Sequence, residues 1–518
     1  MAQINVSNLT FGYEGSYDTI FENVSFSIDT SWKLGFVGRN GKGKTTFLQL
    51  LLGKYEYQGA ITRSVVFDYF PYPVKQKDLE RTAAELMEDW KAGVESWRVL
   101  CELEKVDMDA ELLYRPFGTL SFGERTRVML AVLFSGENDF LLIDEPTNHL
   151  DQDAREIIKK YLASKKGFIL VSHDRDLLDA CIDHVLVLNR ASIEVQSGNF
   201  SSWWENKEKA DNFARMEHEK HVKEIGKLKA AADRSSRWAE KNENTKIGYD
   251  PAKEHDRSIS TRSYIGAKTK KMQSRVKAYE ERMDREIEKK EGLLKDIETV
   301  KDLKIMPLSH YKERLIECRD FSLKYRDGKE HVITGLNFEL KQKNGCGKSS
   351  LIKYILTQNL QNSSNGGIEK RKITMSGCEN LSGENIMATG TCSIASNLVI
   401  SYINQDTSHL SGTLKEFAKK QEIDEPMLLS MLRSLDLDRE QFVKNMEEFS
   451  EGQKKKVLIA ASLLTPAHLY LWDEPLNYID VFSRMQIEKL IAQFQPTMLI
   501  VEHDARFAKK LATKVVEL

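Results

Sequence analysis

Two stretches of the sequence place glycines, a lysine and hydroxyl side chains at a spacing that suits phosphate binding. The first, GRNGKGKTT at 38–46, matches the pattern GxxxxGK[ST]. Glycines at these positions let backbone N–H groups turn toward phosphate oxygens, and the lysine reaches the outer phosphates. We therefore expect a nucleotide to contact Gly38, Arg39, Asn40, Gly41, Lys42, Gly43, Lys44, Thr45 and Thr46.

The second stretch, KNGCGKSS at 343–350, keeps only the later part of this pattern. Asn40 follows Phe26 by 14 positions, whereas Asn344 follows the matching Phe338 by only 6, so about eight residues of strand and first glycine are absent. Two interpretations stay open: a gap in the sequence, or a second site that has degenerated. The expected nucleotide contacts here are Asn344, Gly345, Cys346, Gly347, Lys348, Ser349 and Ser350.

An acidic pair ends an apolar strand in each half of the chain. Asp144 and Glu145 follow FLLI, and Asp473 and Glu474 follow LYLW. Beside a phosphate loop, such an aspartate holds Mg²⁺ and such a glutamate polarises the attacking water. Acids at a strand end can also merely cap a helix, but the pair recurs after a phosphate loop in both halves. We expect Mg²⁺-dependent hydrolysis, with Glu145 and Glu474 as catalytic bases.

The elements that must position these residues occur twice, in the same order. The matching segments are 9–28 and 321–340, 38–46 and 343–350, 120–128 and 449–457, 140–151 and 469–480, and 169–178 and 499–508. Five matches in register predict two copies of one α/β ATPase domain, over residues 1–205 and 313–518. WKLGFVG supplies the first phosphate loop with a strand.

Residues 206–312 have a different character, rich in Lys, Glu, Arg and Ala. Met272, Val276, Tyr279 and Met283 follow the 3–4 spacing of a coiled-coil seam, whereas the earlier part is a weaker helix. Gly and Pro at 248 and 251 interrupt the pattern. We predict two long antiparallel helices joined by a loop near 244–266.

LSFGE, DEPTNHLD and SHD, downstream of a phosphate loop, resemble the signature, Walker B with D-loop, and switch histidine of the ATP-binding cassette (P-loop NTPase) family. The resemblance implies two cassettes closing head-to-tail around two ATPs within one monomer. Ser121, Gly123 and Glu124 would meet the ATP of the second copy, and Ser450, Gly452 and Gln453 that of the first. His173 and His503 would contact γ-phosphate, and Tyr13 and Tyr325 would stack on adenine.

The family's Mg²⁺-sensing glutamine is matched by Gln405 in SYINQD, but Tyr72 takes its place in the first copy. A phenol replaces an amide poorly as a metal ligand, so the first site should sense γ-phosphate less sharply. Another departure is the long segment between Lys348 and Gln405, which reads as a surface loop or disordered insertion around 360–398. The expected metal ligands are Thr45, Asp144, Ser349, Gln405 and Asp473.

Two cassettes in one chain, separated by a helical hairpin, resemble the ABC-F proteins, which act on ribosomes. The long linker, the short span between Tyr72 and Ser121, and WDEPLNY resemble the Lsa/Vga-type resistance branch. That resemblance implies a 70S partner, with entry to the E site, contact with 23S rRNA and the P-site tRNA, and release of a lincosamide, streptogramin A or pleuromutilin. A general translation factor of the same family is the alternative; chromosome ATPases and transporter subunits are further rivals.

The predicted hairpin tip has a local excess of basic residues that suits RNA phosphates, with tyrosines that suit base stacking. A charged helix facing only solvent is the competing interpretation. The expected ribosome contacts are Lys246, Tyr249, Arg257, Arg262, Tyr264, Lys268, Lys270 and Lys271.

The bulk composition agrees with a cytoplasmic protein. The net charge of −2 argues against a globally basic nucleic-acid binder, and no apolar run has the roughly 18–20 residues that a membrane span needs. MAQINVSNLTFGY lacks the features of a signal peptide. The six scattered cysteines are typical of reduced thiols rather than of a disulfide framework.

Overall fold

The structure is a computed structural model. It describes residues 3–13, 19–137, 139–148, 150, 152–188, 193–244, 260–293, 303–325, 331–341, 374–375, 386–502 and 504–516. The chain divides into two compact units: residues 1–201 together with 300–518, and residues 202–299. The first unit contains both cassettes and the second contains the long helices.

The core of the first cassette is a mainly parallel sheet in the order β5-β6-β7-β3-β8-β9, with only β9 antiparallel to its neighbour. Its strands are short apolar runs because helices cover both faces of such a sheet. They are β3 (Lys33–Val37), β5 (Val66–Phe70), β6 (Asp139–Asp144), β7 (Phe168–Val171), β8 (His184–Leu188) and β9 (Ile193–Ser197). The predicted strand before the first phosphate loop is therefore present as β3.

A smaller antiparallel sheet, in the order β2-β1-β4, completes this cassette, and helices follow the strands. Its strands are β1 (Gln3–Phe11), β2 (Phe21–Asp29) and β4 (Gln58–Thr62). The helices are α1 (Lys44–Leu51), α2 (Ala83–Trp90), α3 (Ser96–Lys105), α4 (Phe122–Leu133), α5 (Gln152–Ala163) and α6 (Arg175–Cys181).

The second cassette repeats this plan, with an antiparallel sheet in the order β11-β10-β13 and a parallel sheet in the order β12-β14-β15-β16. The strands are β10 (Arg314–Tyr325), β11 (His331–Lys341), β12 (Thr374–Met375), β13 (Ile386–Ile394), β14 (Ile400–Ile403), β15 (Leu469–Asp473) and β16 (Met498–Val501). The helices are α10 (Leu414–Lys420), α11 (Glu425–Ser434), α12 (Glu451–Leu464), α13 (Val481–Phe494) and α14 (Ala505–Leu511). The predicted fold class, two tandem α/β cassettes, is confirmed.

The predicted insertion is partly wrong, because one portion of it is a strand. Residues 386–394 form β13, which pairs antiparallel with β10 as β4 pairs with β1 in the first cassette. Its small and polar residues suggested a loop, but the partner strand supplies the hydrogen bonds that fix it. Cys318 lies directly opposite Cys392 in this pairing, and both are free thiols. Of the remainder of the predicted insertion, β12 and residues 395–398 are described, and the other residues lie outside the described part of the chain.

The parallel sheet of the second cassette also bears on the short spacing before Asn344. In the first cassette β7 lies between β6 and β3, with β3 leading into the phosphate loop. In the second, β16 has β15 as its only neighbour among the described strands. Within the part of the chain that the structure describes, no strand takes the place of β3.

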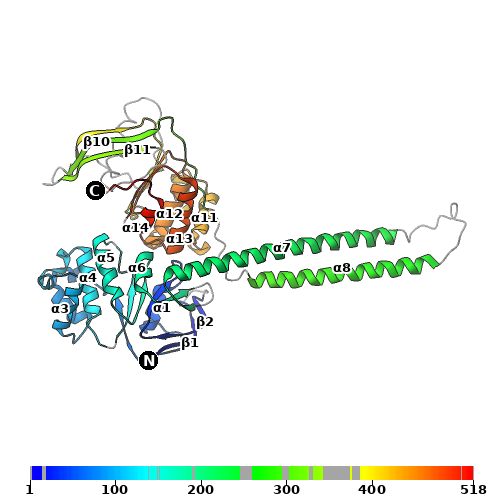
Figure 1. The fold of residues 1–518 in the computed structure, drawn as a ribbon, viewed down its shortest axis with the longest axis horizontal. Helices are drawn as coiled ribbons and strands as arrows, with labels where there is room; N and C mark the ends of the chain where they lie inside the picture. Colours follow the sequence, from blue (N-terminus) through cyan, green and yellow to red (C-terminus); the bar gives the residue numbers. More distant parts are fainter. Residues whose placement is uncertain are drawn as a thin grey trace. The chain divides into compact units, whose positions relative to one another are not determined.

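The second unit is built from α7 (Phe200–Asn244) and α8 (Ser260–Leu293), which run alongside each other in Figure 1. The seam positions Met272, Val276, Tyr279 and Met283 are half-buried, while the positions between them are exposed. Phe213 and Met216 of α7, however, are exposed. Among the described residues, no helix is both long and apolar enough to cross a bilayer.

Helix α8 begins at Ser260, six residues before Gly266, the last residue of the predicted loop. A single glycine inside a long helix costs only about 1 kcal/mol, and the flanking residues sustain the helix. Residues 260–266 are consequently helical, and any connecting loop is shorter than predicted.

Candidate active site

The first phosphate loop connects β3 to α1, and its lysine is the first residue of that helix. Gly41 and Gly43 have φ of 79° and 100°, a region that side chains other than glycine rarely adopt. At Gly43, a Cβ would also come within 2.5 Å of Ile20. The Lys44 ammonium donates to the carbonyls of Gly38 at 2.6 Å and Arg39 at 3.1 Å. The loop is thus curled around its own lysine, and burial lowers the pKa of Lys44.

Thr45 and Asp144 lie together at the C-terminal edge of the sheet. The Thr45 hydroxyl donates to Asp144 Oδ2 at 2.9 Å, and the Tyr69 hydroxyl donates to the same oxygen at 3.2 Å. Burial raises the pKa of Asp144, while these two hydrogen bonds oppose that rise. A hydroxyl and a carboxylate are oxygen ligands of the kind Mg²⁺ takes, so these residues fit the ion that accompanies ATP.

Glu145 lies directly after Asp144 and faces the switch histidine. Its Oε1 lies 3.3 Å from His173 Nε2 but makes no hydrogen bond, and its Oε2 accepts from the His173 backbone at 3.4 Å. Burial and then the charge of Asp144 raise the pKa of Glu145 to about 8. Burial also holds the pKa of His173 well below its usual value. The unpaired oxygen of a carboxyl with a raised pKa suits a group that accepts a proton from water.

Both predicted bases also adopt an unusual backbone conformation, which the sequence did not indicate. Glu145 has φ of 50° and Glu474 has φ of 45°. Left-handed conformations are uncommon for residues other than glycine and tend to occur at functional sites. The recurrence at the same position in both cassettes shows that this turn belongs to the shared fold.

The phosphate loop of the first cassette meets the signature of the second. Asn40 Nδ2 donates to the Tyr478 carbonyl at 2.7 Å. A Cβ on Gly452 would lie 2.5 Å from that carbonyl oxygen and 3.1 Å from Asn40 Nδ2. Gly452 therefore permits the close approach of three backbone and side-chain groups. Tyr478 was not among the predicted site residues, although it lies in the predicted D-loop.

Two ion pairs flank this contact. Arg39 lies 3.4 Å from Asp436, and Lys42 lies 3.2 Å from Asp438. Both acids belong to the turn after α11. Because the basic residues come from the phosphate loop itself, these pairs reinforce the head-to-tail arrangement of the two cassettes.

Each signature serine caps the helix that it precedes. Ser450 Oγ accepts from the Gln453 N–H and the Gln453 side chain accepts from the Ser450 N–H, giving a capping box for α12. Ser121 and Glu124 form the same box at α4. A helix N-terminus presents unpaired N–H groups and a partial positive charge, which suit a phosphate. The N-terminus of α12 lies close to the first phosphate loop, because Gly452 in its first turn lies next to Asn40 of that loop.

Tyr72 is placed differently from the glutamine it was expected to replace. β5 pairs with β6 in the same register as β14 with β15, so Tyr72 and Gln405 hold matching chain positions. The Tyr72 hydroxyl, however, donates to Asp68 at 2.8 Å, and its ring stacks on Trp90. The hydroxyl that donates to Asp144 belongs to Tyr69, a residue that the sequence analysis missed.

Tyr13 lies beside the start of α1. Its hydroxyl is 2.9 Å from Thr46 Oγ1, and its ring makes an edge contact with Tyr55. Tyr13 is 42% exposed, so it is partly accessible to a ligand. This placement is compatible with the predicted contact with adenine.

In the second cassette the acidic pair and its glutamine are brought together. Gln405 Nε2 and Asn477 Nδ2 each donate to Glu474 Oε2 at 2.7 Å, and Asp473 is buried at the end of β15. The rest of this site falls outside the described residues: Asn344, Gly345, Cys346, Gly347, Lys348, Ser349, Ser350 and His503. Tyr325 ends β10, and only its backbone is described.

The predicted RNA contacts are described in part. Lys268, Lys270 and Lys271 are exposed on α8. Arg262 and Tyr264 belong to the same helix, but their side chains lie outside the described part. Lys246, Tyr249 and Arg257 lie outside the described residues altogether.

Comparison with known proteins agrees with this geometry. A family model described as "ABC transporter" matches residues 21–148 and 318–477, which together make up more than half of the chain. The chain therefore belongs to the ABC transporter family and carries two ATP-binding cassettes of that family, which implies ATPase activity.

Individual relatives resemble the chain over nearly its whole length. It is 25% identical to the ribosome protection protein VmlR of Bacillus subtilis, covering 96% of this chain and 84% of that protein. It is 24% identical to the putative ATP-binding protein YdiF of the same species, covering 100% and 79%. The solved structure of the archaeal ribosome recycling factor aABCE1 with stalk protein aP1 matches with a TM-score of 0.56 at 18% identity, covering 98% and 86%. That last likeness supports the fold alone.

Proposed function

We propose that the chain is a cytoplasmic ABC-F ATPase that binds the 70S ribosome and protects it from antibiotics of the peptidyl-transferase centre. The observation that carries the proposal is the contact between the first phosphate loop and the second signature, within one chain whose cassettes are separated by two long helices. Such a monomer needs no second subunit to complete its ATP sites. Similarity to VmlR, a ribosome protection protein, supports the ribosome as partner.

In this proposal Lys44 and the loop N–H groups bind the phosphates of ATP. The N-terminus of α12, capped by Ser450, faces the same phosphates from the other cassette. Mg²⁺, when bound through Thr45 and Asp144, would neutralise the phosphate charge. Glu145 accepts a proton from the attacking water, and the His173 backbone N–H, which donates to Glu145 Oε2, helps to orient that carboxyl.

Closure of the cassettes around ATP then favours binding at the ribosomal E site, with the loop between α7 and α8 reaching toward the peptidyl-transferase centre. Contact with the P-site tRNA or 23S rRNA displaces a bound lincosamide, streptogramin A or pleuromutilin. Hydrolysis reopens the cassettes and releases the protein. ATP thus sets the lifetime of the complex.

The proposal is tested by bacterial cell-free translation inhibited with a lincosamide or a pleuromutilin. The intact protein should restore synthesis, and a variant lacking residues 244–266 should not, although it still hydrolyses ATP. If neither protein restores synthesis while the intact chain still binds ribosomes with ATP, the second candidate applies, a general ABC-F translation factor acting on stalled ribosomes without drug.

A further inference from the structure

The first turn of α7 is held by a side chain from the first cassette. Ser201 is the second residue of α7, and a helix cannot satisfy the N–H groups of its own first turn. The Ser201 N–H donates to Asp179 Oδ1 at 2.7 Å, and the Ser201 hydroxyl donates to the other carboxylate oxygen. Asp179, on α6, therefore caps α7 from outside and places a negative charge at the positive end of its dipole.

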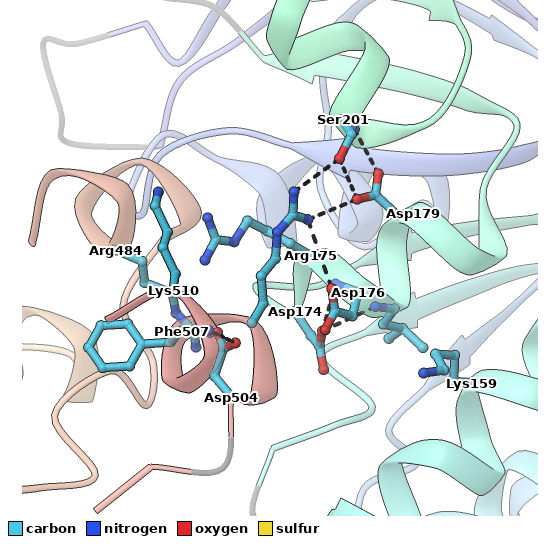
Figure 2. Close-up of polar contacts among 12 residues, drawn as sticks. Lys159, Asp174, Arg175, Asp176, Asp179, Ser201, Arg484, Asp504, Phe507 and Lys510 are labelled. Atoms are coloured by element: carbon cyan, nitrogen blue, oxygen red, sulfur yellow. Dashed lines mark hydrogen bonds and ion pairs between the residues drawn. The ribbon is translucent and has the colours of Figure 1, made fainter. Parts of the chain in front are cut away.

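An arginine from the second cassette completes this cluster. Arg506 on α14 donates through Nη1 to Asp179 Oδ2 at 2.9 Å and through Nη2 to Ser201 Oγ at 3.3 Å. Its Nη1 also lies 3.9 Å from Asp176. Figure 2 shows Asp176, Asp179 and Ser201 gathered at this point. One planar guanidinium thus contacts the cap, the capped residue and a second acid.

Arg506 lies one position beyond the residue that the internal repeat matches to Arg175. α6 and α14 each begin two residues after a predicted switch histidine, in SHDRDLL and EHDARFA. In α6 the first residue, Arg175, forms a buried ion pair with Glu488 of the second cassette. In α14 that place is taken by Ala505, and the next residue, Arg506, crosses to the first cassette instead. α6 and α14 therefore each carry an arginine that contacts the other cassette, but the two arginines bind different kinds of site.

We propose that Arg506 is a positioning residue that reports contact between the cassettes to the first turn of α7. When the cassettes are together, Arg506 holds Asp179 and Ser201 in one geometry. When they separate, Asp179 still caps Ser201 but loses its counter-charge, and the Ser201 hydroxyl loses a donor. The nucleotide bound between the cassettes is in this way linked to the first turn of α7. The inference rests on the proposed function only in one respect, the role of α7 in contacting the ribosome.

The test is hydrogen exchange of the amides at residues 200–204, without ribosomes, in an E145Q/E474Q protein that binds ATP but does not hydrolyse it. ATP should slow exchange there by roughly three- to tenfold, because it brings Arg506 to Asp179 and Ser201. The factor is modest because these hydrogen bonds are partly exposed, and such bonds stabilise less than buried ones. Arg506→Ala should abolish this slowing. Lys509→Ala is the matched control, because it removes an exposed cation from the same helix. The Lys509 ammonium makes no hydrogen bond or ion pair among the described residues, so this variant should retain the slowing.

A second comparison separates positioning from general loss of structure. Asp179→Asn keeps an oxygen that can cap Ser201 but removes the charge that binds Arg506, so it should resemble Arg506→Ala. The double variant should then lose no more than either single variant. Unchanged slowing in Arg506→Ala, additive effects in the double variant, or no effect of ATP on the E145Q/E474Q protein would each overturn the inference. Because no ribosome is present, these outcomes are independent of the proposed function.

Discussion

Asp144 accepts two hydrogen bonds from hydroxyl groups in the first cassette, one from Thr45 and one from Tyr69. Hydrogen bonds donated to a carboxylate stabilise its charged form, which is the form that binds a metal ion. Burial raises the pKa of Asp144 and favours the neutral acid, and these hydrogen bonds limit that rise. Tyr69, a residue of β5 that the sequence analysis did not single out, therefore supports the predicted Mg²⁺ ligand.

Replacing this hydroxyl should weaken the metal site. Tyr69→Phe should raise the Mg²⁺ concentration needed for half-maximal ATP turnover by roughly three- to tenfold, because one charge-assisted hydrogen bond is lost. The measurement is a Mg²⁺ titration of turnover in an E474Q background, which isolates the first site.

Tyr72→Phe is the matched control, because the Tyr72 hydroxyl binds Asp68 instead. It should leave the Mg²⁺ requirement unchanged. A shift in Tyr72→Phe with none in Tyr69→Phe would mean that Tyr72 does take the place of the glutamine.

The chain positions of the expected phosphate-binding and Mg²⁺-binding residues of the first cassette could be read from the sequence, whereas the contact of Tyr69 with Asp144 could not. The spacing GxxxxGK[ST] and the acids after FLLI fix the chain positions of Lys44 and Asp144 from sequence alone. The register that aligns Tyr72 with Gln405 was also readable from the repeat. The direction of the Tyr72 side chain depends on Asp68 and Trp90, contacts that only the folded chain brings together.

At the scale of elements, the helices after the signature motifs carry the same N-terminal design in both cassettes. Ser121 with Glu124 and Ser450 with Gln453 each form a capping box. S-x-x-E and S-x-x-Q are legible in the sequence, so this feature could have been predicted. The strand β13 was not predicted, because the polar, Gly/Ser-rich segment around it indicated a loop, and its pairing with β10 appears only in the folded chain.

Removing the Ser450 hydroxyl should affect both stability and nucleotide binding. Ser450→Ala should cost about 1 kcal/mol through the lost cap. It should also raise the KM for ATP by roughly tenfold, because the N-terminus of α12 is disturbed where the proposed function places the phosphates of ATP.

Thr413→Ala removes the same kind of capping box from α10, away from the phosphate loop contact. It should show the stability loss without the change in KM, as measured by thermal unfolding and steady-state turnover. Equal KM values in the two variants would argue against a nucleotide-facing role for the N-terminus of α12.

At the scale of the whole molecule, the contact between the first phosphate loop and the second signature requires a glycine. The Cβ of an alanine at Gly452 would press on the Tyr478 carbonyl that accepts from Asn40. Gly452→Ala should therefore lower kcat for ATP by about tenfold or more, since overpacking of a tight contact costs 1–3 kcal/mol. Gly226→Ala, where an added Cβ meets no atom within 4 Å, should leave turnover unchanged. Comparable kcat values in both variants would show that this contact is not used.

The repeat made the two-cassette plan predictable, but not the details that join the cassettes. Contacts such as Asn40 with Tyr478 link residues 438 positions apart, and no local pattern encodes them. The asymmetry between Arg175 and Arg506 becomes meaningful only when both partners are placed. The second phosphate loop and the tip loop stay predictions, because they lie outside the described residues.

The central claim is that ATP-driven binding to the ribosome removes a drug, and release of radiolabelled lincosamide from 70S ribosomes tests it most directly. The E145Q/E474Q protein with ATP should free the drug from the ribosomes that it binds, and the same protein lacking residues 244–266 should bind and leave the drug in place. If the full-length variant binds ribosomes and the drug remains bound, protection by displacement is contradicted.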